Sequence, residues 1–179
     1  MRADAQRNRA AILAAAEVVF AREGPAASTE QVAALAGVAI GTVFRHFPTK
    51  DALLRALMKD ALARLSADAT ELIEHGDPGT SLFLFFADVV AQAAAKKTVA
   101  DLLATGGPEV TADGPVAALH EELGALLSGA QSAGTAHADV GLPEVAALLA
   151  ATSDAALRAG WDEGLQKRAL AVIFAGLRP

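Results

Sequence analysis

"GVAIGTVFRHFPTKDALL", residues Gly37 to Leu54, is the stretch that decides how this chain is interpreted. Two glycines, two phenylalanines, an Arg-His pair, a proline and a lysine lie within it. The basic residues are unexpected in a chain whose formal net charge is −6. A glycine between two short apolar segments is typical of a helix-turn-helix, in which two helices meet at a tight turn.

The segments on either side of this glycine predict a series of helices. Ser28 and Gln31 have the spacing of a capping box, in which the two side chains satisfy open backbone N–H groups at a helix start. We expect this first short helix to end at Gly37 and a second to span residues 39–46. A proline then interrupts the pattern, and leucines at helical spacing predict a long helix over residues 49–75.

In a helix-turn-helix, the second helix enters the DNA major groove and its N-terminal half meets base edges. Small residues would let this helix lie close to the duplex: Ala39, Gly41 and Thr42. Arg45 can reach a guanine edge or a phosphate, and His46 and Lys50 would lie near a phosphate. Three apolar residues are spaced to pack inward: Val38, Val43 and Phe47. Spacing by itself leaves open an ordinary helical hairpin with a solvated Arg-His pair.

Composition favours an all-α fold in a reducing, cytoplasmic setting. Hydrophobic residues make up 53% of the 179 residues, and much of this is alanine and leucine, which favour helices. No apolar/polar alternation persists over the length of a strand. The chain has no cysteine, which excludes disulfides and thiolate zinc sites. The apolar stretch 81–95 contains an aspartate and a glutamine and is shorter than the roughly 20 residues of a membrane span.

The charges are distributed unevenly along the chain. Residues 1–59 carry eight Lys/Arg and five Asp/Glu, a balance of +3. Residues 60–179 carry seven Lys/Arg and sixteen Asp/Glu, a balance of −9. This asymmetry favours a nucleic-acid-binding end attached to an acidic body.

The stretch from Ala5 to Leu65 resembles the DNA-binding domain of the TetR (tetracycline repressor) family of bacterial regulators. The matching text is "ILAAAEVVFAREG" followed by "STEQVAALAGVAIGTVFRHFPTKDALL". The resemblance implies an N-terminal three-helix helix-turn-helix domain over residues 5–65, with its motif at 28–47. It also implies a C-terminal helical ligand-binding and dimerisation domain over residues 66–179.

The resemblance implies a role for each matching position in the motif. Ser28 and Thr29 would contact phosphates, and Lys50 would hold another. Four residues would face the groove or its walls: Ile40, Thr42, Arg45 and His46. The family commonly has serine at the position of Ala39 and tyrosine at that of Phe44. Phe44 has no hydroxyl to donate to a phosphate, and we expect it to make an apolar contact with a sugar or a thymine methyl group instead.

The rest of the chain predicts helices over residues 80–97, 113–133, 143–159 and 161–177, after a first helix at 5–22. We expect an effector pocket among helices 80–133, with apolar walls at Phe83, Phe86, Val90, Leu103, Leu123 and Leu127. Polar groups within reach of it are Thr98, Asp101, Thr105 and His120. His120 is expected to be a core or pocket histidine. The effector would be small and mostly apolar.

We expect a homodimer through helices 142–159 and 161–177, as the resemblance also implies. Six residues on these two helices carry more apolar surface than one helical hairpin can bury: Val145, Leu148, Leu149, Leu157, Leu165 and Phe174. The dimer would bind a double-stranded DNA operator and release it when the effector binds. Whether it represses or activates is open, although repression is usual in the family.

No catalytic constellation is apparent. "HEELG" has Gly124 where a zinc-protease helix would have a second histidine, and the four histidines lack metal-ligand spacing. We therefore expect no enzyme activity, no metal and no cofactor. The alternatives are a helical-bundle enzyme or carrier for small apolar molecules, and an interaction module that does not bind DNA.

Overall fold

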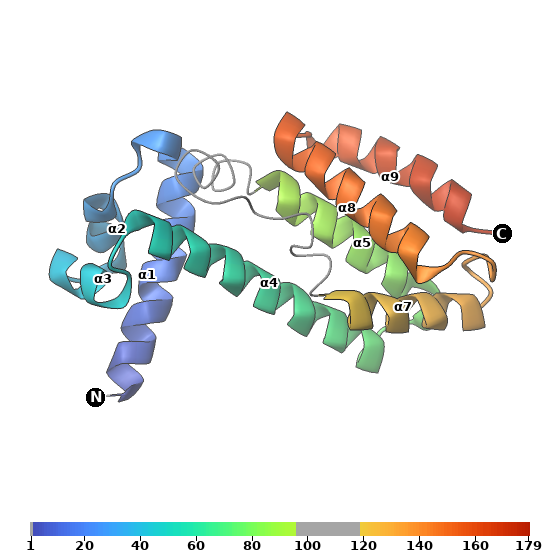
Figure 1. The fold of residues 1–179 in the computed structure, drawn as a ribbon, viewed down its shortest axis with the longest axis horizontal. Coiled ribbons are helices and arrows are strands. Elements are labelled where there is room, and N and C mark those ends of the chain that lie inside the picture. The colour runs from blue at the N-terminus through green and yellow to red at the C-terminus, as the bar shows by residue number, and fades with distance from the viewer. Residues whose placement is uncertain (1, 96–118) are drawn as a thin grey trace. The chain divides into compact units, whose positions relative to one another are not determined.

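The structure, a computed structural model, describes residues 2–95 and 119–179. These residues form helices joined by short turns, with no strand in the described ranges, so the all-α prediction is confirmed (Figure 1). They divide into two compact units, one of residues 2–61 and one of residues 62–95 and 119–179. Each unit has its own hydrophobic core.

The first unit contains the helix-turn-helix. Its elements are α1 (Arg2–Glu23), a 3₁₀ turn (Gly24–Ala26), α2 (Thr29–Ala36), α3 (Ile40–His46) and the first turns of α4 (Lys50–His75). The order matches the prediction, although α1 begins three residues earlier than expected. Helix α2 packs against both α1 and α3.

Local sequence explains where α2 begins and ends. The Ser28 hydroxyl accepts a hydrogen bond from the Gln31 backbone N–H, and the Gln31 side chain accepts one from the Ser28 N–H, so the predicted capping box is confirmed. Gly37 ends the helix with a φ of +67°, a left-handed conformation that glycine adopts without steric cost. This residue makes the turn toward α3.

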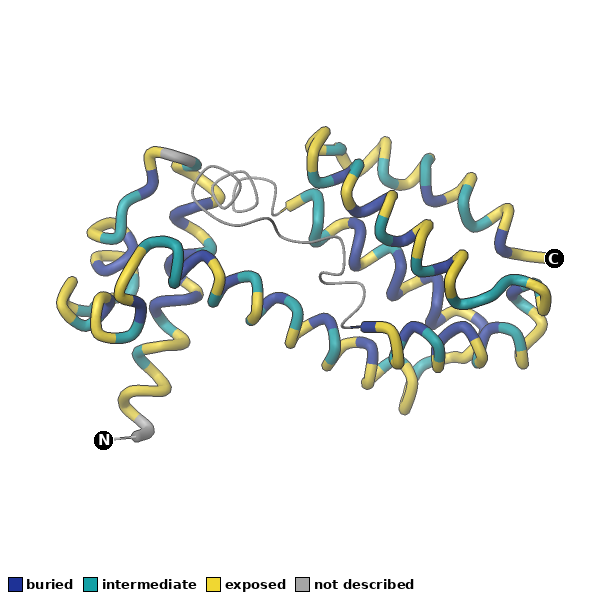
Figure 2. Tube along the Cα trace, viewed as in Figure 1, coloured by how far each residue is buried: buried dark blue, intermediate teal, exposed yellow. Residues whose placement is uncertain are grey.

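The core of the first unit fixes α3 on its support. Val43 is fully buried and Phe47 nearly so, in one cluster with Ile12 and Phe20 of α1. Val38 packs against the same cluster, so the prediction that these three residues point inward is confirmed. Figure 2 shows buried positions recurring along α1, which is the helical spacing of an amphipathic helix.

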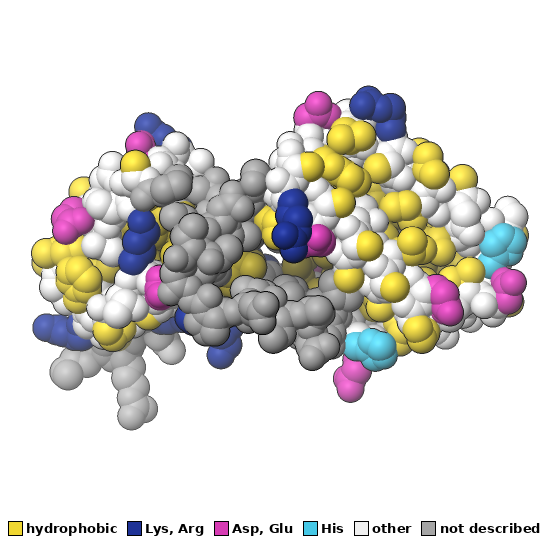
Figure 3. Space-filling view, turned by 45° about the horizontal axis from the view of Figure 1, so that its top comes forward, with side chains coloured by type: hydrophobic (Ala, Val, Ile, Leu, Met, Phe, Trp, Pro, Cys, Tyr) yellow, Lys and Arg dark blue, Asp and Glu magenta, His cyan; other side chains and the backbone are white. Residues whose placement is uncertain are grey.

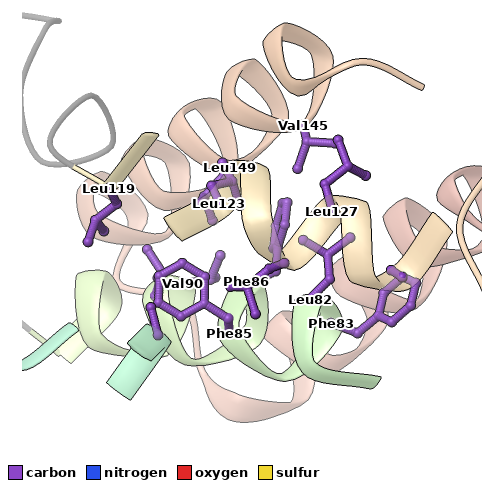
Figure 4. Packing of buried hydrophobic residues seen from close by; sticks show 14 of the residues in the cluster. Leu82, Phe83, Phe85, Phe86, Val90, Leu119, Leu123, Leu127, Val145 and Leu149 are labelled. Atoms are coloured by element: carbon purple, nitrogen blue, oxygen red, sulfur yellow. The ribbon is translucent and has the colours of Figure 1, made fainter. Parts of the chain in front are cut away.

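The second unit is a helical bundle built around α5 (Pro78–Ala95). Its other elements are the remainder of α4, α7 (His120–Ser132), α8 (Leu142–Ala159) and α9 (Glu163–Leu177). Helix α5 makes its most extensive contacts with α8 and α7. Leu82, Phe85 and Phe86 of α5 are fully buried with Leu123 and Leu149 of the neighbouring helices (Figure 4).

Helix α5 begins at Pro78, two residues earlier than the sequence predicted. Its 18 residues have a mean hydropathy of 1.3, so by length and composition it is long enough to cross a membrane. Eight of its residues are buried against the other helices of the unit. That burial is typical of the central helix of a folded core, and we interpret α5 in this way.

Candidate nucleic-acid interface

Helix α3 exposes one face and buries the opposite one. The exposed face is formed by Ile40, Gly41, Phe44 and Arg45, at positions i, i+1, i+4 and i+5. Thr42 and His46 flank this face and are half-buried. The residues that the sequence predicts for the groove therefore lie on or beside the side of α3 that is turned away from the core.

Two large apolar side chains stand in this exposed face. Ile40 is 37% and Phe44 is 44% exposed, although the first unit has a well-formed core a turn away. Arg45 lies beside Phe44 on the same helix. Apolar groups that can contact thymine methyls, next to an arginine that can pair with guanine, have the composition of a surface that reads the major groove.

The start of α3 differs from that of α2. Ala39 is its N-cap residue, with extended backbone angles, but its methyl side chain makes no capping hydrogen bond. Serine at such a position can accept a hydrogen bond from an open backbone N–H group. Alanine at position 39, where the family commonly has serine, therefore leaves α3 without a side-chain cap. Helix α3 then depends on its buried residues for stability.

Ser28 and Thr29 lie at the start of α2 and are half-buried. The Ser28 hydroxyl is already engaged in the capping box. A hydrogen bond from the backbone of Glu30, and then one from Ser28, lower the pKa of the Glu30 carboxyl. Glu30 is therefore a firmly ionised group next to the two residues that we expect to contact phosphates.

Lys50, the first residue of α4, makes contacts within the chain. Its ammonium donates a hydrogen bond to the Ala27 carbonyl at 2.7 Å, and its Nζ lies 5.4 Å from the centre of the Phe20 ring. A cation is unfavourable at the N-terminus of a helix, and the hydrogen bond to Ala27 and the contact with Phe20 offset that cost. Lys50 joins α4 to the segment before α2 and to α1. Its predicted phosphate contact remains a prediction.

Replacing Lys50 with alanine is expected to lower the free energy of unfolding of the first unit by about 1 kcal/mol, since one hydrogen bond and one cation–π contact are lost. Urea denaturation measures this loss. Lys59→Ala, an exposed lysine on the same helix, is the matched control and should change stability little. Equal stability of the two variants would show that Lys50 has no structural role.

Arg9 is a candidate that the sequence interpretation missed. Its guanidinium carbon lies 5.4 Å from the centre of the Phe47 ring, at the C-terminal end of α3. The side chain is exposed and belongs to α1, far from the motif in the sequence. The sequence does contain an indication of this role, because three of the first nine residues are arginines and the helix-turn-helix motif does not explain them.

The residues predicted to line an effector pocket separate into three groups. Five are members of the buried cluster of the second unit: Phe83, Phe86, Val90, Leu123 and Leu127. Four lie outside the described residues: Thr98, Asp101, Leu103 and Thr105. His120, the first residue of α7, is exposed, so the expectation of a core or pocket histidine is wrong. In the described ranges, no group of His, Asp or Glu side chains comes together as metal ligands.

The expected dimer face also needs a correction. Val145 and Leu149 are fully buried in the core of their own unit and cannot face a partner. Helix α8 is apolar on more than one side, and the side that carries these two residues packs against α5. The large apolar residues that remain exposed on α8 and α9 are Leu148, Leu165 and Val172.

A tight glycine turn that presents an exposed basic and apolar helix, in a chain that also contains a separate helical bundle, is the arrangement of a helix-turn-helix transcriptional regulator. Comparison with family models agrees: residues 12–57 match the model of bacterial regulatory proteins of the tetR family. Residues 77–179 match the model of the SbtR-like transcriptional regulator C-terminal domain.

Solved structures give the same assignment over nearly the full chain. A TetR transcription regulatory protein from Mycobacterium vanbaalenii is 42% identical, with 99% of each chain covered and a TM-score of 0.78. The TetR regulator SCO0520 from Streptomyces coelicolor is 32% identical, with 96% of this chain and 98% of that one covered and a TM-score of 0.76. The chain belongs to the TetR family of bacterial transcriptional regulators.

A curated relative is similar over a shorter range. The probable HTH-type transcriptional regulator ArpR of Pseudomonas putida is 36% identical over 101 residues, which are 52% of this chain. The match spans 48% of the length of that relative, or about half of it.

Proposed function

We propose that this regulator binds a palindromic DNA operator as a homodimer and is released from it by a small, mostly apolar effector. The observation that carries the proposal is the exposed face of α3, where Ile40, Phe44 and Arg45 stand together while Val43 and Phe47 anchor the helix. Exposed apolar residues beside an arginine fit a groove that offers both thymine methyl groups and guanine acceptors.

In this proposal, the residues around the motif have two kinds of role. Base edges are read by the face of α3, with Arg45 on a guanine and Ile40 and Phe44 against apolar groups. The backbone of the DNA is held by Ser28, Thr29, His46 and Lys50, with Arg9 as an additional cation. Ala39, Gly41 and Thr42 contribute by their small size, because they let the helix approach the base pairs closely. Phosphate contacts position the protein, while base contacts give specificity.

Dimerisation is proposed through the outer faces of α8 and α9. Figure 3 shows hydrophobic side chains gathered over the second unit, and Val172 is 75% exposed on α9. A twofold contact is self-complementary, so an apolar stripe on these helices would pack against its own copy. This proposal uses Leu148, Leu165 and Val172 in place of the buried Val145 and Leu149.

Leu148→Glu is expected to shift the protein from dimer to monomer, because it places two carboxylates in an apolar contact between the copies. Leu148 is 39% exposed, so the fold of the unit should survive the change. Light scattering over a range of concentrations measures the change in mass. Leu84→Glu is the control, because Leu84 is an exposed leucine on α5, outside the proposed face. A wild-type protein that is monomeric at all concentrations would contradict the interface.

The effector is proposed to bind within the core of the second unit. In the described part of that core, the buried polar residues are Ser81, Thr152 and Ser153, and none is charged. An ion without a partner is costly to bury, so such a core favours a neutral molecule. The effector would act by binding one of two conformations better than the other, which shifts the population away from the form that fits DNA.

The test of the proposal is binding to a duplex taken from the upstream region of the protein's own gene, compared with a scrambled duplex of equal length. We expect preferential binding that weakens steeply with salt, since phosphate contacts release counterions. Equal affinity for both duplexes would contradict sequence recognition. Binding of small apolar molecules without any DNA binding would instead favour the carrier alternative.

A further inference from the structure

Two large apolar side chains are exposed together on the shortest α-helix of the first unit. Ile40 and Phe44 both belong to α3, which has seven residues. In the described part of this unit, the other exposed large hydrophobic residues are Val18 on α1 and Leu35 on α2, one on each helix. An apolar side chain that stays in water contributes little to folding, so the pair on α3 is available to a partner.

The helix surface around this pair is open. Residues four positions apart lie one above the other on a helix, so Ile40 and Phe44 are neighbours on one face. Gly41 lies beside them, and a Cβ atom placed on it would meet no other atom within 4 Å. Among the described residues, no protein group therefore covers this part of α3, and a base-pair edge can approach it directly.

The side chains of Ile40 and Phe44 can read only one kind of group in the major groove. Neither has a hydrogen-bond donor or acceptor. Base-pair edges in the major groove offer donors, acceptors and a single apolar group, the C5-methyl of thymine. Covering a polar edge with an apolar side chain is unfavourable, because the lost hydrogen bonds to water are not replaced. These two residues therefore favour base pairs that carry a methyl group.

Helix geometry limits which base pairs the two residues contact. Four residues correspond to about 6 Å along a helix, and successive base pairs are about 3.4 Å apart. Ile40 and Phe44 would therefore reach separate base pairs about two steps apart. Arg45 lies next to Phe44 on the same exposed face, so a guanine that it reads would lie close to both methyl groups.

We propose that Ile40 and Phe44 recognise the C5-methyl group itself, whichever pyrimidine carries it. Thymine and 5-methylcytosine place this methyl group at the same position in the major groove and differ in the polar group beside it, with which an apolar side chain makes no hydrogen bond. Methylation of an operator cytosine that faces either residue therefore strengthens binding. The regulator is in this way sensitive to cytosine methylation of its DNA. The inference rests on the proposed function, because it requires α3 in the major groove.

The first test compares two versions of the duplex from the upstream region of the protein's own gene, one with thymidine and one with deoxyuridine throughout. Deoxyuridine lacks only the methyl group. Fluorescence anisotropy at a fixed salt concentration measures both affinities. The wild-type protein is expected to bind the deoxyuridine duplex roughly three- to fourfold more weakly for each methyl contact, and more than tenfold more weakly for the four contacts of two half-sites.

The second test assigns each methyl group to a residue. Single deoxyuridine substitutions locate the sensitive positions, where the pyrimidine is then changed to cytosine and to 5-methylcytosine. The wild type should bind 5-methylcytosine roughly three- to fourfold more tightly than cytosine. Phe44→Ala should abolish this difference at one position and Ile40→Ala at the other, and neither should disturb the fold, because both residues are exposed. Phe44→Leu, which keeps an apolar side chain, and Arg45→Ala should retain the difference.

Failure of this inference can be told apart from failure of the proposed function. Equal affinity for the thymidine and deoxyuridine duplexes, with both preferred over a scrambled duplex, would overturn the inference and leave the proposed function standing. A deoxyuridine effect that persists in Ile40→Ala and in Phe44→Ala would also overturn it, because the methyl groups would then act through the shape of the DNA. Absence of any preference over the scrambled duplex would overturn the proposed function and this inference together.

Discussion

Leu149→Glu is expected to unfold the second unit. Leu149 is fully buried in the cluster that joins α5, α7 and α8 (Figure 4), so the substitution removes an apolar side chain from the core and buries a carboxylate without a partner. The combined cost is about 4 kcal/mol or more. This is a large share of the roughly 5–15 kcal/mol by which a domain is stable. Circular dichroism during thermal denaturation measures the loss.

The neighbouring Leu148→Glu is the matched control for this prediction. The two residues are adjacent on α8, but Leu148 is 39% exposed, whereas Leu149 is 0% exposed. The control should keep its helical signal and its cooperative melting while changing its state of association. If the two variants melt at the same temperature, the assignment of one residue to the core and the other to the surface is wrong.

Arg45→Ala is expected to weaken operator binding by about 1–3 kcal/mol, or roughly 5- to 150-fold. Arg45 is exposed on the same face of α3 as Ile40 and Phe44, and a bidentate contact with guanine would be lost without replacement. The loss should be confined to one base pair in each half-site, because other contacts are kept. Fluorescence anisotropy with operator variants substituted at each position measures both effects at a fixed salt concentration.

Arg22→Ala controls for the change in net charge. Arg22 is an exposed residue in the last turn of α1, and no role in DNA binding is proposed for it. It should reduce affinity for all duplexes slightly and equally. If Arg45→Ala behaves in the same way, Arg45 contacts a phosphate and does not read a base.

The helix-turn-helix could be predicted from the sequence because its determinants are local. The capping box of Ser28 and Gln31 and the left-handed Gly37 each depend on a few consecutive residues. The inward direction of Val43 and Phe47 follows from helical periodicity once the helix start is known. For the same reason, the order of the helices was predicted correctly, and most helix ends were predicted to within a few residues.

The second unit could be predicted less well, since its determinants are contacts between distant segments. Helix α8 carries apolar residues on more than one face, so periodicity does not decide between Leu148 and Leu149. The assignment of His120 to the core failed because helical spacing from Leu123 and Leu127 does not decide burial at the first residue of α7, where the His120 side chain is exposed. The hydrogen bond from Lys50 to the Ala27 carbonyl joins residues 23 positions apart, so the sequence pattern around either residue does not predict it.

In α3, one set of residues anchors the helix and a different set is exposed for DNA, and this separation has an evolutionary consequence. The helix has seven residues, too few to be stable alone, and Val43 and Phe47 at its buried side hold it in place. The side chains that would meet DNA contribute little to that anchoring. Substitutions at Ile40, Phe44 or Arg45 are therefore nearly free of a stability penalty, and a duplicated copy of this protein can drift toward a new DNA sequence without first having to survive a poorly folded intermediate.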